Sequence, residues 1–223
     1  MNKFIEYYSQ EIRRYGGIKR YVAAKASEKK PLIDRIREYA KNKQVLEAGC
    51  GSAVNSIFLA NEGFNLTCID RDLNILKFAK INSKVFNKNP KFINLDIKRL
   101  KRIKNKFDVS FSHGVLEHYP DSQIIELINS QLDVAKFVII SVPSSFFKPS
   151  EAINGDERFL DEKHWSNIIS KTNGTLIEKF GYFYDSNRPK IKFLRFISTL
   201  TLNKLPKTKP YFGFVVEKKQ RCT

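Results

Sequence analysis

Apolar residues recur at helical spacing through the first part of the chain. Between residues 4 and 15 they return every three or four positions, and Gly16 and Gly17 end the pattern. A second stretch of the same kind follows Pro31. These patterns predict two helices within a helical cap over residues 1–43, which is too small to be a domain of its own.

From residue 44 to residue 143 the pattern changes to an alternation of short apolar runs and stretches of helical period. Alternation of this kind predicts right-handed crossovers and a parallel sheet covered on both faces. The expected strands are QVLEA, NLTCID, KFINLD, FDVSFS and FVIISV, and the expected helices span residues 53–61, 73–86 and 122–135.

After Pro143 the alternation loosens, and the chain predicts one more helix and two more strands. Asp161 caps the helix, and the runs TLIEKFGYF and YFGFVVEKK have the composition of strands that could pair as neighbours. Residues 184–209 lie between these runs and include a basic amphipathic stretch. We interpret this insertion as a surface helix docked on the sheet, and the alternatives are a flap over a substrate or a helix on a lipid surface.

These elements predict the α/β class, with a doubly wound, mostly parallel seven-stranded sheet. Neither an internal repeat nor a low-complexity linker divides the chain. We therefore expect a single domain over residues 1–223, made of the cap at 1–43, a core at 44–143 and a second half at 144–223.

The chain of 223 residues carries a formal net charge of +17 at pH 7. Such a charge favours an anionic partner: nucleic acid, a phosphorylated small molecule or an acidic membrane surface. Scattered lysines are also what a solvated surface contains, and the basic stretch with interleaved aromatic residues spans residues 188–209. Since the sequence shows no appended RNA-binding module, nucleic acid is not the favoured partner.

Membrane-spanning segments and metal sites are not expected from this sequence. It has no apolar run of about 18 residues and no apolar leader, so we expect a cytoplasmic protein without a transmembrane segment. Cys50, Cys68 and Cys222 have neither the pairing of a disulfide framework nor the C-x-x-C spacing of a zinc site. We expect reduced thiols and no bound metal, and the sequence indicates no oligomeric state.

The stretch VLEAGCGSAVNSIFLANEGFNLTCIDRD, residues 45–72, predicts a strand, a glycine turn, a helix and a second strand. Gly49 and Gly51 allow a tight turn whose backbone a ligand can approach. Asp70 ends the second strand 21 positions after Gly49, where a carboxylate can accept hydrogen bonds from ribose hydroxyls. The pattern predicts a nucleoside site. A dinucleotide is disfavoured, because Val54 stands where its fingerprint requires Gly or Ala.

This stretch resembles the first motif of the class I S-adenosylmethionine-dependent methyltransferases, an acidic residue followed by G-x-G-x-G. Here the motif is E-x-G-x-G-x-A, with Ala53 in place of the third glycine. Further matches follow in order over residues 44–143: Asp70 ends the second strand, Asp96 in FINLDI ends the third, FDVSFSHGVLEHYPD resembles the fourth strand and its loop, and VIISVPS resembles the fifth strand.

The resemblance implies an enzyme that uses S-adenosylmethionine to methylate an O, N, S or C atom of a small molecule, which can be anionic. It also implies that the last of the seven strands is antiparallel, that residues 44–143 bind the cofactor and that the second half faces the acceptor. Glu47 and the turn backbone would hold the methionine end, Asp70 the ribose and Asp96 the adenine. The implied cofactor-binding residues are Glu47, Gly49, Cys50, Gly51, Asp70, Arg71, Asp96, Ile97, Ser112 and His113.

Methyl transfer from a sulfonium requires nucleophile, carbon and sulfur to be held in line, and a base is optional. His113 is our candidate catalytic base, because histidine titrates near neutrality; the alternative is packing beside the cofactor. Candidate acceptor-binding residues are Tyr8, Tyr15, His118, His164 and Trp165, and core packing is the alternative for Trp165.

Two other functions stay open from the sequence. RNA or protein could be the acceptor, held by the basic surface, or the chain could be a binding protein with this fold and no turnover. Methylation of nucleobases is disfavoured, because SHGV at residues 112–115 replaces the N-P-P-Y signature that would follow the fourth strand. Ser144 follows Pro143 where a cysteine nucleophile would stand.

Overall fold

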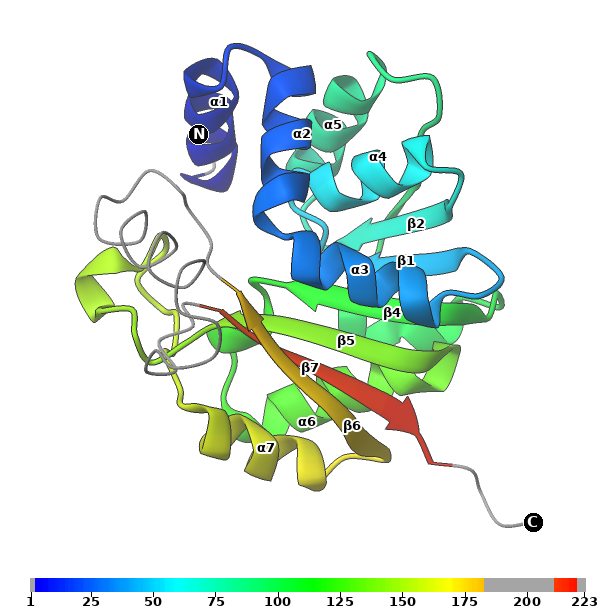
Figure 1. The fold of residues 1–223 in the computed structure, drawn as a ribbon, viewed down its shortest axis with the longest axis vertical. Helices are drawn as coiled ribbons and strands as arrows, with labels where there is room; N and C mark the ends of the chain where they lie inside the picture. The colour runs from blue at the N-terminus through cyan, green and yellow to red at the C-terminus, as the bar shows by residue number, and fades with distance from the viewer. Residues whose placement is uncertain (1–2, 183–210, 220–223) are drawn as a thin grey trace, which may run out of the picture.

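A seven-stranded sheet forms the centre of the computed structural model, which describes residues 3–182 and 211–219 (Figure 1). Its order is β3-β2-β1-β4-β5-β7-β6, and β7 runs antiparallel to both β5 and β6 while the other neighbours are parallel. The predicted fold class is confirmed. The strands are β1 Gln44–Ala48, β2 Asn65–Asp70, β3 Lys91–Asn94, β4 Phe107–His113, β5 Ala135–Pro143, β6 Gly174–Tyr182 and β7 Tyr211–Lys218.

The strand order reverses between β1 and β4. After β1 the chain moves outward to β2 and β3, and it then returns to β4 on the other side of β1. The loops that leave the carboxyl ends of β1 and β4 therefore diverge, which opens a crevice at this end of the sheet. The two C-terminal strands pair as neighbours, as predicted. The predicted insertion, residues 184–209, lies outside the described residues.

Helices cover both faces of the sheet, and most begin and end where the sequence indicates. Asp72 caps α5 by accepting hydrogen bonds from the backbone N–H groups of Asn74 and Ile75, and Asp161 caps α7 in the same way. The helix α2 was not predicted as a separate element. The bounds are α1 Lys3–Arg14, α2 Ile18–Glu28, α3 Lys30–Tyr39, α4 Val54–Asn61, α5 Leu73–Ser83, α6 Asp121–Val134 and α7 Glu162–Ser170, with short 3-10 helices η1 Ile97–Arg102, η2 Leu116–His118 and η3 Pro149–Glu151.

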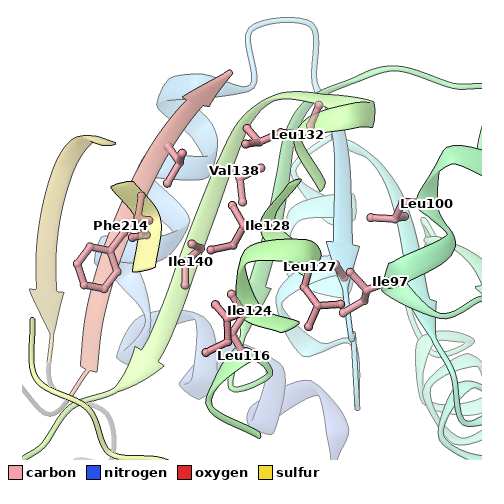
Figure 2. Packing of buried hydrophobic residues seen from close by; sticks show 14 of the residues in the cluster. Ile97, Leu100, Leu116, Ile124, Leu127, Ile128, Leu132, Val138, Ile140 and Phe214 are labelled. Carbon is pink, nitrogen blue, oxygen red and sulfur yellow. The ribbon is translucent and has the colours of Figure 1, made fainter. Parts of the chain in front are cut away.

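Separate apolar clusters fill the two faces. On one face α6, α7 and η1 pack against the sheet, and Figure 2 shows Ile124, Leu127 and Ile128 of α6 between the strands and Ile97 of η1. On the other face α2, α3, α4 and α5 contribute the buried residues. None of the helices in these described ranges is long and apolar enough to cross a membrane.

Truncation of Ile128 tests the packing of the first cluster. Ile128 is fully buried on α6, so Ile128→Ala leaves a cavity and is expected to lower the free energy of unfolding by about 2–5 kcal/mol. Chemical denaturation measures the change. Ile177→Ala is the control, because 41% of Ile177 is exposed on β6, and a cost as large as that of Ile128→Ala would contradict this account of the core.

Candidate functional site

The turn from β1 to α4 is held by backbone hydrogen bonds to the neighbouring strand. The N–H groups of Gly49 and Cys50 both donate to the carbonyl oxygen of Ile69, at 3.0 and 2.9 Å. Gly49 and Gly51 have φ values of +74° and +52°, a region that favours glycine. Ala53 also has a positive φ, +55°, which explains why a third glycine suits this position.

Asp70 ties this turn to the end of β2. One of its carboxylate oxygens accepts a hydrogen bond from the N–H of Gly51 at 3.2 Å, and the other accepts from the N–H of Asp72 at 2.9 Å. Burial raises the pKa of Asp70, although these two hydrogen bonds oppose that effect. A carboxylate accepts up to about four hydrogen bonds, so Asp70 keeps capacity for a ligand.

A cavity of about 250 Å³ lies beside Asp70. It is lined by the glycine turn, by the first residues of α5 and η1, and by the loop after β4. The carboxylate of Asp96 caps η1 by accepting a hydrogen bond from the N–H of Lys98 at 2.8 Å. The predicted cofactor residues that line this cavity are Gly49, Gly51, Asp70, Arg71, Asp96 and Ile97.

A second cavity of about 360 Å³ borders the first, and the two share Phe4, Tyr8, Gly49, Gly114 and His118. Its walls come from α1 and α2, the end of β4 and the loop after β5. Many lining side chains are aromatic. The predicted residues Glu47, Cys50 and His113 line this second cavity.

Glu47 belongs to a buried polar network that the sequence analysis missed. Its carboxylate accepts hydrogen bonds from the side chains of Asn55 at 3.0 Å and Ser56 at 2.6 Å. The side-chain amide oxygen Oδ1 of Asn55 accepts a hydrogen bond from Lys29 Nζ at 3.2 Å. Burial raises the pKa of Glu47 and lowers the pKa of Lys29. The adjacent polar residues Asn55 and Ser56 near the start of the mostly apolar helix VNSIFLAN were the signal in the sequence.

His113 sits at the end of β4 in a cluster of hydroxyl groups. Its Nδ1 lies 3.0 Å from the Ser141 hydroxyl and 3.2 Å from the Tyr182 hydroxyl, and these two hydroxyls are 2.5 Å apart. Burial lowers the pKa of His113 well below its ordinary value, and the charges of Lys29 and Lys25 add to this effect. The imidazole is therefore neutral near pH 7 and can accept a proton.

Helix α1 places Tyr8 over the glycine turn. A Cβ atom added at Gly51 would lie 2.4 Å from the Tyr8 hydroxyl, and one at Gly49 would lie 2.7 Å from a methyl group of Val115. Any side chain at either glycine would therefore collide with its neighbour. Burial, with a contribution from Asp70, raises the pKa of Tyr8.

The short helix η2 carries Glu117 and His118 to the border of the larger cavity. His118 Nδ1 lies 2.6 Å from a carboxylate oxygen of Asp156. Glu117 is 3% exposed, and one of its carboxylate oxygens has no hydrogen-bond partner among the described residues. Burial raises the pKa of Glu117 to about 7.

Four of the predicted site residues line neither cavity. Ser112 is buried on β4, and its hydroxyl has no partner among the described residues. The Tyr15 hydroxyl donates to Glu28 at 2.8 Å. His164 Nε2 lies 2.8 Å from a carboxylate oxygen of Asp121, and Trp165 is completely buried in the first apolar cluster. Among the described residues, Tyr15, His164 and Trp165 thus border neither cavity, and their role toward an acceptor stays a prediction.

Comparison with known families and sequences gives a family match over most of the chain and partial matches to individual proteins. The family described as "Methyltransferase domain" matches residues 40–181. The ubiquinone biosynthesis O-methyltransferase of Coxiella burnetii (strain RSA 493) is 32% identical over 83 residues, which cover 37% of this chain and only 36% of that protein. The protein of the same name from Erwinia tasmaniensis is 25% identical over 59% of this chain and 68% of its own length.

Solved structures share the fold at low sequence identity. The magnesium protoporphyrin IX methyltransferase of Synechocystis PCC 6803, crystallised with bound SAH, aligns with a TM-score of 0.61 and 15% identity over 94% of this chain and 86% of that one. An S-adenosylmethionine-dependent methyltransferase from Clostridium acetobutylicum ATCC 824 aligns with a TM-score of 0.63 and 13% identity over 88% and 92%.

The buried carboxyl group of Glu117 predicts a pH-dependent stability. Its pKa is about 7 in the folded protein and 4.5 when unperturbed, so between these values the folded state holds a proton that the unfolded state has lost. This contribution to stability is therefore lost as the pH rises. Relative to Glu117→Gln, which cannot ionise, the wild type should become less stable by about 2–3 kcal/mol between pH 5 and pH 8.

Denaturant titrations of both proteins at several pH values measure this difference. Glu126→Gln, the same substitution at an exposed residue of α6, is the control. A constant difference between wild type and Glu117→Gln across this pH range would contradict the raised pKa.

Proposed function

This chain belongs to the methyltransferase domain family, and we propose on that premise that it transfers a methyl group from S-adenosylmethionine to a small-molecule acceptor by in-line displacement. The observation that carries the proposal is the pair of adjoining cavities on either side of one glycine turn. One cavity has the carboxylates suited to a nucleoside, and the other has room for a second reactant.

The residues present fit the cofactor. Asp70 at the end of β2 is the acceptor for the ribose hydroxyls, and Asp96 on the same cavity is the acceptor for the adenine amino group. Glu47 and the turn backbone face the methionine end in the larger cavity. Gly49 and Gly51 are required because side chains there would meet Val115 and Tyr8.

The bound sulfonium supplies an already activated leaving group, so the protein has to align the reactants and exclude water. Phe4, Tyr7 and Tyr8 of α1 line the larger cavity and screen it from solvent. Aromatic faces also attract a sulfonium cation. Neutral His113 is the candidate base for an acceptor that has to lose a proton, and the Ser141 and Tyr182 hydroxyls hold its ring.

We propose a small molecule as acceptor because the larger cavity is lined on several sides and has the size of a ligand pocket, about 360 Å³. The names of the ubiquinone biosynthesis relatives support this proposal. An anionic group on the acceptor would meet Arg14, Lys25 and Lys29 on the cavity wall. We also propose a cytoplasmic location, which is supported by the free thiols of Cys50 and Cys68.

Removal of the Asp70 carboxylate tests the cofactor site. Because charged hydrogen bonds to the ribose are lost, Asp70→Ala should weaken the binding of S-adenosylmethionine and of S-adenosylhomocysteine by about 10- to 100-fold. Isothermal titration calorimetry measures both affinities. Equal affinity in variant and wild type would reject this site for the ribose.

Asp108→Ala is the matched control for that experiment. Asp108 also accepts two backbone hydrogen bonds, from Asn42 and Gln44, but it lies at the opposite end of the sheet. Its loss should change stability and leave the affinity for both compounds unchanged. Thermal unfolding of each variant shows whether the chain remains folded.

The acceptor can be identified by incubating the protein with methyl-labelled S-adenosylmethionine and cell extract. We expect label in small metabolites, and label confined to RNA or protein would contradict a small-molecule acceptor.

A variant of His113 tests its role as the base. Once the acceptor is identified, His113→Asn should lower turnover about 10²- to 10⁴-fold if His113 acts as base. Its affinity for S-adenosylhomocysteine should stay within a few-fold of the wild type.

A further inference from the structure

A large share of the positive charge of this protein lies in one continuous part of the chain. Residues 73–107 contain eleven lysine and arginine residues and a single acidic residue, Asp96, in a chain whose net charge is +17. All eleven side chains are exposed. They are Lys77, Lys80, Lys84, Lys88, Lys91, Lys98, Arg99, Lys101, Arg102, Lys104 and Lys106. We call the surface that they form the basic edge.

The fold brings these residues to one margin of the molecule. β3 is the outermost strand on that side of the sheet, α5 precedes it and η1 follows it. α5 packs against β2 and β3 within the apolar cluster of one face, while Ile97 and Leu100 anchor η1 in the cluster of the other face (Figure 2). The basic edge therefore wraps around the margin of the sheet at β3.

Little of this charge is neutralised by the protein itself. Within residues 3–182 and 211–219, the ion pair made by these eleven side chains joins Lys101 to Asp133 at 3.4 Å. The carboxylate of Asp96 is occupied at the start of η1 and faces the smaller cavity. Eleven exposed cations around one margin give a strong positive potential there, which attracts an extended anionic surface.

Exposed aliphatic residues accompany the lysines on α5 and just after it. Leu73 is 52% exposed, Ile81 65% and Val85 48%, and these are three of the six large apolar residues that the described chain exposes. The aromatic residues of the same stretch point elsewhere. Phe86 and Phe92 pack against the apolar cluster, and Phe78 stacks on Tyr8.

We propose that the basic edge docks on the surface of an anionic membrane. Lysines on flexible stems suit the mobile headgroups of anionic lipids, and Ile81 and Val85 can enter the boundary between headgroups and acyl chains. Nucleic acid fits this surface less well, because single strands are held by exposed aromatic side chains on which bases stack, and the aromatic residues of this stretch are turned inward. The inference is independent of the methyl-transfer proposal.

Co-sedimentation with lipid vesicles tests this inference directly. The wild-type protein should bind vesicles made of equal parts phosphatidylglycerol and phosphatidylcholine, and this binding should weaken steeply as salt is raised. Vesicles of phosphatidylcholine alone should not retain it. Absence of binding to the anionic vesicles at low salt would overturn the proposal.

Charge reversal separates the basic edge from the overall charge. One variant combines Lys80→Glu, Lys84→Glu and Lys88→Glu. Its vesicle binding should be at least about 100-fold weaker, since each lysine near an anionic membrane raises the affinity roughly fivefold. The control carries Lys163→Glu, Lys171→Glu and Lys218→Glu, three exposed lysines towards the opposite margin of the sheet, and has the same net charge. The control should lose far less binding, and an equal loss in both variants would overturn the proposal.

Two further measurements keep the test decisive. If the α5 variant unfolds, it is replaced by a variant that combines Lys98→Gln, Arg99→Gln and Lys104→Gln around η1, for which the same loss of vesicle binding is the test.

A double variant with Ile81→Ser and Val85→Ser keeps the charge. It should bind vesicles several-fold more weakly, because the aliphatic contact with the lipid is lost. A single-stranded RNA oligonucleotide that displaces the protein from anionic vesicles at equal concentration of phosphate groups would overturn the membrane assignment in favour of nucleic acid.

Discussion

The short turn between β1 and α4 borders both cavities of the site and depends on hydrogen bonds to the end of β2. Its backbone N–H groups at Gly49 and Cys50 share one acceptor, the carbonyl oxygen of Ile69, and the N–H of Gly51 is held by the Asp70 carboxylate. A hydrogen bond to a charged group stabilises more than a neutral one, and here it joins two neighbouring strands. These hydrogen bonds hold the turn in place, and Gly49 of the turn lines both cavities.

Buried charge holds the helical cap against this turn. The Lys25 ammonium is 3.2 Å from Glu11 of α1 and 3.1 Å from Glu28 of α2, and Lys25 is only 2% exposed. A buried ion pair costs desolvation and adds little net stability, but removing one partner leaves a buried charge. We interpret the triad as a device that fixes how α1 sits on α2. That placement brings Tyr8 onto Gly51.

Charged residues of the described structure lie in two settings, buried at the site and exposed to solvent around β3. At the site, Glu47 and Lys29 are buried with hydrogen-bond partners. Burial raises the pKa of Glu47 and lowers the pKa of Lys29, which favours the neutral form of each side chain. Around β3 the lysines are exposed and almost unpaired, so their effect is a field that extends into solvent. The same chain thus buries Glu47 and Lys29 at the site and leaves the charges of its margin exposed.

The sequence by itself determined the sheet, the glycine turn and the carboxylates at the ends of β2 and β3. Apolar periodicity, Gly49 and Asp70 are local signals, since each depends on neighbours within a few residues or one strand–helix unit. Right-handed crossovers leave few topologies for such a sheet, but the order of its strands came from the structure. The separate helix α2 was missed, because its face is set by packing on α4.

Only the tertiary structure decided which side chains complete the site. Tyr8 meets Gly51 from a helix far away in sequence, and Tyr182 reaches His113 across 69 positions. Trp165 had the chemistry of a pocket residue but fills the core. Such contacts depend on how whole elements pack, and packing depends on shape and buried area summed over many residues, which no short stretch of sequence encodes.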